Sequence, residues 1–367
     1  MIYLVLFSLS AFFVSLLNQT KGLIRSILLL FSILLPSILF GLRSTSMGID
    51  TQVYVEPIWN IAQSVNSFDF GDSHFAKAES GYLFLNYVLS SCFDDIHWLY
   101  FTIAFVSCSA VLMALLKSEF ADYAWLGYTY YLFLFIPSSV NLIRQGPSNA
   151  LLFVACIAFL QEKWKKFLSF VLLATLLHNS ALIALSFLVI YYVLKKNEKK
   201  GMLVMIGVAL FCSVCGQIVF SKFAMFNEKY LIYVNGSFSP HFTIFSLVFI
   251  PFVILFALYY ESFKKMFPYT PLVLIMLIYA TIFYQLSWIV SVYLARVADP
   301  YKYFGIVAVM MILKWVKEKN RKNLHIVTYA LIVYALMYFW LAFNVAKQGG
   351  VIPYKSEIVD EIIGGIL

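Results

Sequence analysis

One stretch of sequence decides the fold: Phe167-Leu-Ser-Phe-Val-Leu-Leu-Ala-Thr-Leu-Leu-His178-Asn179-Ser180-Ala-Leu-Ile-Ala-Leu-Ser-Phe-Leu-Val-Ile-Tyr-Tyr-Val-Leu194. Lysine clusters flank it, at Lys163–Lys166 and Lys195–Lys200. Lys and Arg in short loops are retained on the cytoplasmic side of a membrane, so both ends of this apolar run are predicted to lie inside. A single span cannot start and finish on the same side. The run therefore predicts a hairpin of two short helices that is hinged at residues 178–180.

The hinge contains the only strongly polar residues of this run, His178, Asn179 and Ser180. An irregular backbone at membrane depth is tolerated only where it is buried in protein or lines a water-filled cavity. His178 is therefore predicted to lie in such a cavity and to face the outer half of the membrane.

The rest of the chain has the composition of a membrane protein. Of its 367 residues, 62% are apolar and 12% are charged, whereas soluble domains have about 45–50% and about 25%. A helix needs roughly 20 apolar residues to cross a bilayer. We expect an all-α polytopic membrane protein, a single integral membrane domain over residues 1–367, with about twelve transmembrane helices including the hairpin at 167–194. Both termini are predicted outside, and one large outer segment over residues 43–95 is expected to supply part of the active site.

The positive charge of the chain follows the same topology. The chain has 26 Lys and Arg against 18 Asp and Glu, a net charge of +8. Most of these basic residues fall in the predicted inner loops, so the excess indicates topology and not nucleic acid as a partner. The five cysteines lie in or beside apolar runs, and Cys212 and Cys215 fall in mid-helix without a second pair. We expect neither a disulfide framework nor a metal site.

Arginine is used selectively on the predicted outer side. Three of the five arginines, Arg43, Arg144 and Arg296, fall at outer helix ends that are far apart in the sequence. The planar guanidinium binds phosphate or carboxylate through two parallel hydrogen bonds. These positions predict an anionic substrate, and the alternative at each is a side chain that snorkels toward the interface.

The first two arginines have polar companions. Arg43 is followed by Asp50 and Tyr54, in a turn that can direct a cation and a carboxylate toward one site; alternatively, Asp50 is an N-cap of the next helix. Arg144 and Gln145 open a helix, and the Gly-Pro pair that follows predicts a break that exposes backbone N–H groups. Free N–H groups and the helix dipole make such an end a good anion site.

The third arginine and one acidic residue complete the set. Arg296 precedes Asp299 by three residues, so the alternative to substrate binding is an ion pair between the two. Glu79 precedes a moderately apolar stretch that ends at Cys92. It is either an ordinary first-turn carboxylate or, if this stretch forms a half-inserted outer helix, a member of the same cavity as His178.

Together these residues favour a lipid-linked substrate with a diphosphate. Arginines that bind the diphosphate let it leave without a divalent metal, while His178 or a carboxylate activates an attacking hydroxyl. The sequence contains no HExxH, P-loop, nucleophile elbow or dinucleotide fingerprint. No cofactor is expected.

Six short motifs follow one another along nearly the whole chain. They are Arg43 with Gly48-Ile-Asp50-Thr-Gln-Val-Tyr54, Glu79-Ser-Gly-Tyr82, Ile143-Arg144-Gln145, His178-Asn-Ser180-Ala181, Arg296 with Tyr303, and Pro353-Tyr354-Lys355. In this order and spacing they resemble the EpsG-like branch of the Wzy-type polysaccharide polymerases of bacteria. The chain departs from that pattern at Gly146-Pro147, where such proteins usually continue with helix-forming residues.

The resemblance implies a glycosyltransferase of the bacterial inner membrane with its active site at the outer face. It would move a growing O-antigen or capsule chain from undecaprenyl diphosphate to the non-reducing-end hydroxyl of an acceptor repeat unit, with membrane lipid and a chain-length regulator as further partners. We expect Arg43, Arg144 and Arg296 to hold the donor diphosphate, supported by Tyr54, Gln145 and Tyr303. The candidates for the base or for acceptor positioning are His178, Asp50 and Glu79. Two alternatives are a flippase or exporter of lipid-linked oligosaccharide and a membrane sugar acyltransferase.

Overall fold

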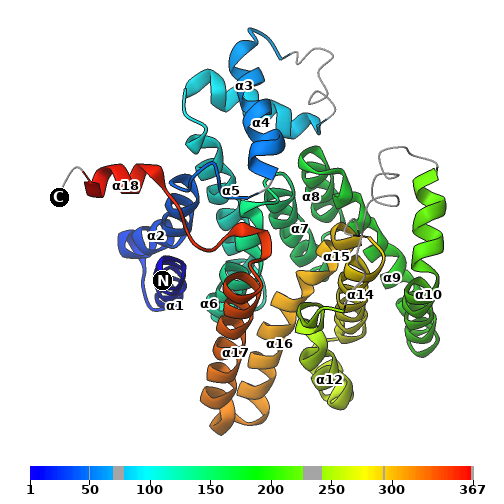
Figure 1. The fold of residues 1–367 in the computed structure, drawn as a ribbon. Coiled ribbons are helices and arrows are strands. Elements are labelled where there is room, and N and C mark those ends of the chain that lie inside the picture. Colours follow the sequence, from blue (N-terminus) through cyan, green and yellow to red (C-terminus); the bar gives the residue numbers. More distant parts are fainter. Residues whose placement is uncertain (49, 69–77, 226–241, 292–293, 365–367) are drawn as a thin grey trace. The chain divides into compact units, whose positions relative to one another are not determined.

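The structure is a computed structural model, and it describes residues 1–48, 50–68, 78–225, 242–291 and 294–364. Within these ranges every regular element is a helix (Figure 1), which confirms the predicted all-α class. Residues 49 and 69–77 of the predicted outer segment lie outside the described ranges. The chain divides into two compact units, Met1–Ala181 with Lys322–Leu367, and Leu182–Arg321.

The helices of each unit are as follows. The first unit contains α1 (Ile2–Leu16), α2 (Gly22–Gly41), α3 (Glu56–Ser64), α4 (Ser80–Cys92), α5 (His97–Leu116), α6 (Ala124–Tyr130), α7 (Gln145–Leu160), α8 (Trp164–Leu177), α17 (Leu324–Phe339) and α18 (Glu357–Gly364). The second unit contains α9 (Ser186–Lys196), α10 (Glu198–Met225), α12 (Ile250–Leu258), α13 (Tyr260–Met266), α14 (Thr270–Ile289), α15 (Leu294–Lys302) and α16 (Phe304–Lys319).

The described residues contain six helical segments that are long and apolar enough to cross a bilayer, or up to seven if a bent pair counts as one span. The six are Ile2–Gln19, Gly22–Gly41, His97–Leu116, Asn179–Lys196, Thr270–Ile289 and Arg321–Val345, and the bent pair is Ile244–Leu258 with Tyr260–Met266. The chain is therefore a multi-pass membrane protein, but the predicted number of about twelve spans is not confirmed. Several other apolar helices are too short, since α7 has 16 residues and α8 has 14, against the roughly 20 that a span needs. The predicted orientation of the termini stays a prediction.

The predicted break in the run 167–194 is confirmed. Helix α8 ends at Leu177, and His178 has an extended backbone with φ −158° and ψ 122°. A 3₁₀ segment, Asn179–Leu185, leads from there to α9. His178 therefore lies at a helix end, where its side chain is free to point away from the helix axis.

The apolar run predicted at about 123–137 is not one regular helix. After α6 the chain forms a π turn over Tyr131–Phe135 and a 3₁₀ turn over Ile136–Val140. Pro137 has no backbone N–H, so it cannot donate the hydrogen bond that a regular α-helix requires at this position. The irregular segment that results ends at Arg144, directly before α7.

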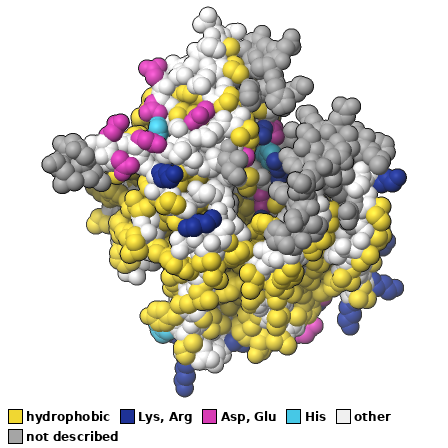
Figure 2. Space-filling model, in the orientation of Figure 1, with side chains coloured by type: hydrophobic (Ala, Val, Ile, Leu, Met, Phe, Trp, Pro, Cys, Tyr) yellow, Lys and Arg dark blue, Asp and Glu magenta, His cyan; other side chains and the backbone are white. Residues whose placement is uncertain are grey.

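The core of the first unit is rich in aromatic contacts. Phe7 of α1, Phe133 of the π turn and Phe339 of α17 are at most 2% exposed. The ring of Phe133 lies 5.5 Å from each of the other two, in edge-to-face geometry, and such pairs contribute about 0.5–1.5 kcal/mol each. On the surface, hydrophobic side chains cover the face formed by α2 and α17, whereas acidic side chains gather around α18 and the segment before α5 (Figure 2).

A C-terminal strap, residues 351–357, lies against the start of the outer segment. The backbone N–H of Ser44 donates to the carbonyl of Lys355 at 2.8 Å, and the hydroxyl of Ser44 donates to the carboxylate of Glu357. The hydroxyl of Tyr354 donates to the carbonyl of Leu39 at 2.8 Å. The motif Pro353-Tyr354-Lys355 thus belongs to a segment that holds the loop after α2.

Candidate active site

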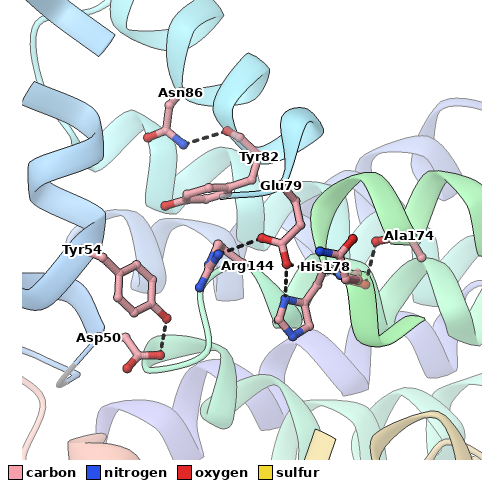
Figure 3. Close-up of polar contacts among 10 residues, drawn as sticks. Asp50, Tyr54, Glu79, Tyr82, Asn86, Arg144, Ala174 and His178 are labelled. Carbon is pink, nitrogen blue, oxygen red and sulfur yellow. Dashed lines mark hydrogen bonds and ion pairs between the residues drawn. The ribbon is translucent and has the colours of Figure 1, made fainter. Parts of the chain in front are cut away.

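Three predicted site residues meet in the first unit, each at the end of a helix (Figure 3). Glu79 directly precedes α4, Arg144 directly precedes α7, and His178 directly follows α8. Residues at helix ends leave the regular backbone, so their side chains can converge from three helices on one point. Of the two alternatives left open for Glu79, the structure shows the one in which this carboxylate contacts His178.

The carboxylate of Glu79 is the centre of this cluster. Its Oε2 lies 2.7 Å from Nη1 of Arg144, and its Oε1 lies 2.9 Å from Nδ1 of His178. Oε1 also accepts a hydrogen bond from the backbone N–H of Asn179 at 3.2 Å. The side chains of Glu79 and His178 are 8% and 9% exposed. Both oxygens of Glu79 are therefore engaged in a nearly dry environment.

Gly81 allows α4 to approach α8 closely enough for these contacts. A Cβ atom at position 81 would lie 2.7 Å from the backbone carbonyl oxygen of Leu176, in the last turn of α8. Any side chain there would force the two helices apart. The motif Glu79-Ser-Gly-Tyr82 thus combines a carboxylate with the one residue type that lets this carboxylate reach His178.

Charge partners decide the ionisation of this cluster. Burial alone would raise the pKa of Glu79, but the hydrogen bond with His178 and the charge of Arg144 lower it to about 2. Burial alone would likewise lower the pKa of Arg144, but the Glu79 carboxylate and Tyr54 raise it overall. Glu79 is therefore ionised at neutral pH and is a weak base.

Tyr54 and Asp50 extend the cluster on the far side of Arg144. The guanidinium carbon of Arg144 lies 4.7 Å from the centre of the Tyr54 ring, within range of a cation–π interaction. The Tyr54 hydroxyl donates to the carboxylate of Asp50 (Figure 3). Asp50 occupies the N-cap position of the following π turn, but its side chain makes no capping hydrogen bond there.

Asn141 and Gly48 position the loop that carries Asp50. The backbone N–H of Asp50 donates to Oδ1 of Asn141 at 3.1 Å. Gly48 has φ +87°, and a Cβ there would lie 2.7 Å from the carbonyl oxygen of Val140. Glycine is required at this position both by the left-handed backbone and by the close approach of the two loops.

Arg43 is buried inside the protein, with 1% of its surface exposed. Its guanidinium donates to the carbonyl of Met47 at 2.5 Å and to the hydroxyl of Thr51 at 3.3 Å. Its central carbon lies 4.0 Å from the centre of the Tyr100 ring. These contacts hold the loop between α2 and the π turn at Thr51–Val55. A role of Arg43 at the donor diphosphate stays a prediction.

The start of α7 differs from the predicted open anion site. Helix α7 begins at Gln145 and runs through Gly146 and Pro147 without a break. The N–H of Gly146 donates to the carbonyl of Leu142 at 2.7 Å, and proline has no N–H to offer. The side chain of Gln145 is also buried. Neither Gly146 nor Pro147 therefore offers a free backbone N–H to an anion.

Arg296 and Tyr303 belong to the second unit. Arg296 lies in α15, and Tyr303 is a buried residue between α15 and α16. In the same helix Asp299 pairs with Lys302 at 2.5 Å, and Nζ of Lys302 lies 4.0 Å from the centre of the Tyr284 ring. The sequence did not single out Lys302. That Arg296 and Tyr303 serve the same substrate as Arg144 stays a prediction.

The fold and the site together define a class: an all-helical, multi-pass membrane protein with a buried carboxylate–arginine–histidine cluster at the ends of its helices. A model of the EpsG family matches residues 26–356. The chain therefore belongs to the EpsG family, a family of Wzy-like polymerases. The comparisons with curated proteins and with solved structures gave no match.

Proposed function

We propose that this protein polymerises lipid-linked oligosaccharide repeat units in O-antigen or capsule biosynthesis. It transfers the growing glycan from undecaprenyl diphosphate to the non-reducing-end hydroxyl of an acceptor repeat unit, at the outer face of the bacterial inner membrane. The observation that carries the proposal is the pairing of His178 with Glu79 in a member of the EpsG family. This pairing supplies the general base that glycosyl transfer to a hydroxyl requires.

His178 is the base in this mechanism, and Glu79 orients it. The carboxylate beside Nδ1 favours the tautomer with its proton on Nδ1, so that Nε2 carries the free electron pair. Nδ1 lies 2.9 Å from Oε1 of Glu79, whereas Nε2 is buried and has neither an ion-pair nor a hydrogen-bond partner among the described residues. Glu79 itself is a poor base, because its pKa is held near 2. Its charge instead stabilises the imidazolium that forms when His178 takes a proton.

The proposed transfer step requires neither a metal ion nor a nucleotide sugar. The acceptor hydroxyl oxygen attacks the anomeric carbon of the donor glycan, while its proton moves to Nε2 of His178. The bond between the anomeric carbon and the diphosphate oxygen breaks, and undecaprenyl diphosphate leaves with the electron pair. Arg296 is our candidate for binding that leaving group, because arginine recognises phosphate through a planar fork.

Purified protein in proteoliposomes tests the proposal. The substrate is a pool of lipid-linked repeat units extracted from cells that lack this chain, supplied without nucleotide sugar. We expect a ladder of polymer on a gel, abolished by His178→Ala and retained in the matched control His325→Ala, because His325 is exposed at the start of α17. Absence of a ladder together with measurable transbilayer movement of the lipid would show a carrier in place of a polymerase.

A further inference from the structure

Two of the candidate site arginines, Arg43 and Arg144, lie in the first unit and already have contacts within the protein. Arg43 is 1% exposed and donates through Nη1 to Met47 and through Nη2 to Thr51, while its Nε has no hydrogen-bond partner among the described residues. Arg144 bonds Glu79 through Nη1 and lies over the ring of Tyr54. A diphosphate that bound the guanidinium group of either arginine through two hydrogen bonds would have to displace contacts that position the site residues.

The charges of this cluster also disfavour a diphosphate. One continuous chain of contacts runs from His178 through Glu79, Arg144 and Tyr54 to Asp50 (Figure 3). This chain of contacts contains two carboxylates, Asp50 and Glu79, and one guanidinium, Arg144. A diphosphate would add further negative charge beside Glu79 and Asp50, and like charges in close contact repel. Neutral hydroxyl groups meet no such repulsion.

Hydroxyl groups find suitable partners here. An ionised carboxylate has about four acceptor positions, and Asp50 accepts one bond, from the Tyr54 hydroxyl. The side chain of His178 is 9% exposed, and its Nε2 has no partner within the described part of the chain. The cluster therefore offers an acceptor at each end and a cation between them.

We propose that this cluster binds the acceptor sugar of the incoming repeat unit and not the diphosphate of the donor. The inference rests on the proposed function. Asp50 accepts a hydrogen bond from one sugar hydroxyl, while Nε2 of His178 receives the proton of the attacking hydroxyl. Tyr54 positions Asp50, and Arg144 holds Glu79 and Tyr54 in place. The cations for the donor diphosphate then come from elsewhere in the protein.

The test separates the two substrates. The acceptor probe is the repeat unit on a simple alkyl chain without diphosphate, which can accept a glycan but cannot donate one. With Asp50→Asn, we expect the KM for this acceptor to rise about tenfold, as follows from losing a hydrogen bond to a charged group, and the KM for the diphosphate-linked donor to stay within twofold. Asp94→Asn is the matched control, because Asp94 is an exposed carboxylate of the same outer segment. It should change neither KM.

The outcomes distinguish this inference from the proposed function. If wild-type protein transfers no glycan from the donor to any acceptor, the polymerase proposal fails and the inference fails with it. If wild-type protein is active but Asp50→Asn raises the donor KM and leaves the acceptor KM unchanged, the inference alone is overturned. Should Asp50→Asn not fold, Tyr54→Phe removes the hydroxyl that positions Asp50 and keeps the ring under Arg144. The KM for the acceptor and the KM for the donor, measured with this variant, then test the inference in the same way.

Discussion

Substituting Gly81 by alanine perturbs the site without touching any of its charged groups. A Cβ at this position must move from 2.7 Å to at least 3.4 Å from the Leu176 carbonyl oxygen, a shift of about 0.7 Å. That oxygen belongs to the backbone of α8, so it cannot swing aside as a flexible side chain would. The start of α4, which carries Glu79, has to retreat.

The retreat weakens the contact on which the mechanism depends. Glu79 and His178 are 2.9 Å apart, and the same shift would bring them to about 3.6 Å, beyond hydrogen-bonding distance. A hydrogen bond to a charged group contributes about 1.5–3 kcal/mol, so we expect turnover to fall roughly 10- to 100-fold. Helix propensity acts in the opposite direction, since alanine favours a helix over glycine by about 1 kcal/mol.

The assay is the initial rate of ladder formation by purified protein, with the unfolding temperature measured in parallel. Gly207→Ala in α10 is the matched control, because a Cβ there would meet nothing within 4 Å. It should keep the wild-type rate. If Gly81→Ala polymerises within twofold of wild type at equal amounts of folded protein, the close approach of α4 and α8 does not position Glu79, and the reasoning is refuted.

Three further predictions concern the charged residues. Arg144→Lys should reach normal membrane levels but polymerise far more slowly, because an ammonium cannot hold Glu79 and cover Tyr54 together; full activity in the same gel assay would show that the planar fork is unnecessary. The folded-state pKa of Glu79 is about 2, below its ordinary 4.5, so the unfolded chain binds its proton first and stability is lost as pH falls below about 4.5. Between pH 6 and 3 the unfolding temperature of the wild type should therefore fall more steeply than that of Glu79→Gln. Parallel curves of unfolding temperature against pH would contradict this. Arg43→Lys should lower the free energy of unfolding by about 1–2 kcal/mol and leave the donor KM unchanged. An unchanged unfolding temperature with a raised donor KM would show instead that Arg43 binds the donor diphosphate.

The sequence predicted the part of the site that follows from the distribution of charged residues along the chain. Lysine clusters at both ends of the run 167–194 required a break, and His178 was the polar residue at that break. Arg144 was placed at a helix end on the same predicted side, and contact with this site was one of two alternatives for Glu79. Both inferences use the high cost of charge and irregular backbone in a membrane, which few alternative folds can escape.

Other features depended on packing that no periodicity reveals. From the sequence alone Arg43 cannot be told from an arginine that points outward. In the structure its side chain is buried, where it contacts the ring of Tyr100 and donates to the carbonyl of Met47. The Gly-Pro pair at 146–147 suggested a break, whereas proline in the first turn of a helix disrupts nothing because its missing N–H is not needed there. The predicted number of spans is not confirmed for a similar reason, since hydropathy alone does not distinguish short apolar helices such as α7 from membrane-crossing ones.

The C-terminal strap has a consequence for the order in which the protein is made. Ser44 and its partner Glu357 are 313 residues apart in sequence. At about 5–20 residues per second, roughly 15 to 60 seconds pass between the synthesis of the loop that leads to Asp50 and the arrival of the segment that fastens it. The chain has therefore synthesised most of its helices before the loop that leads to Asp50 can be fastened by Glu357. A ribosome that stalls before residue 357 would leave Ser44 without this partner.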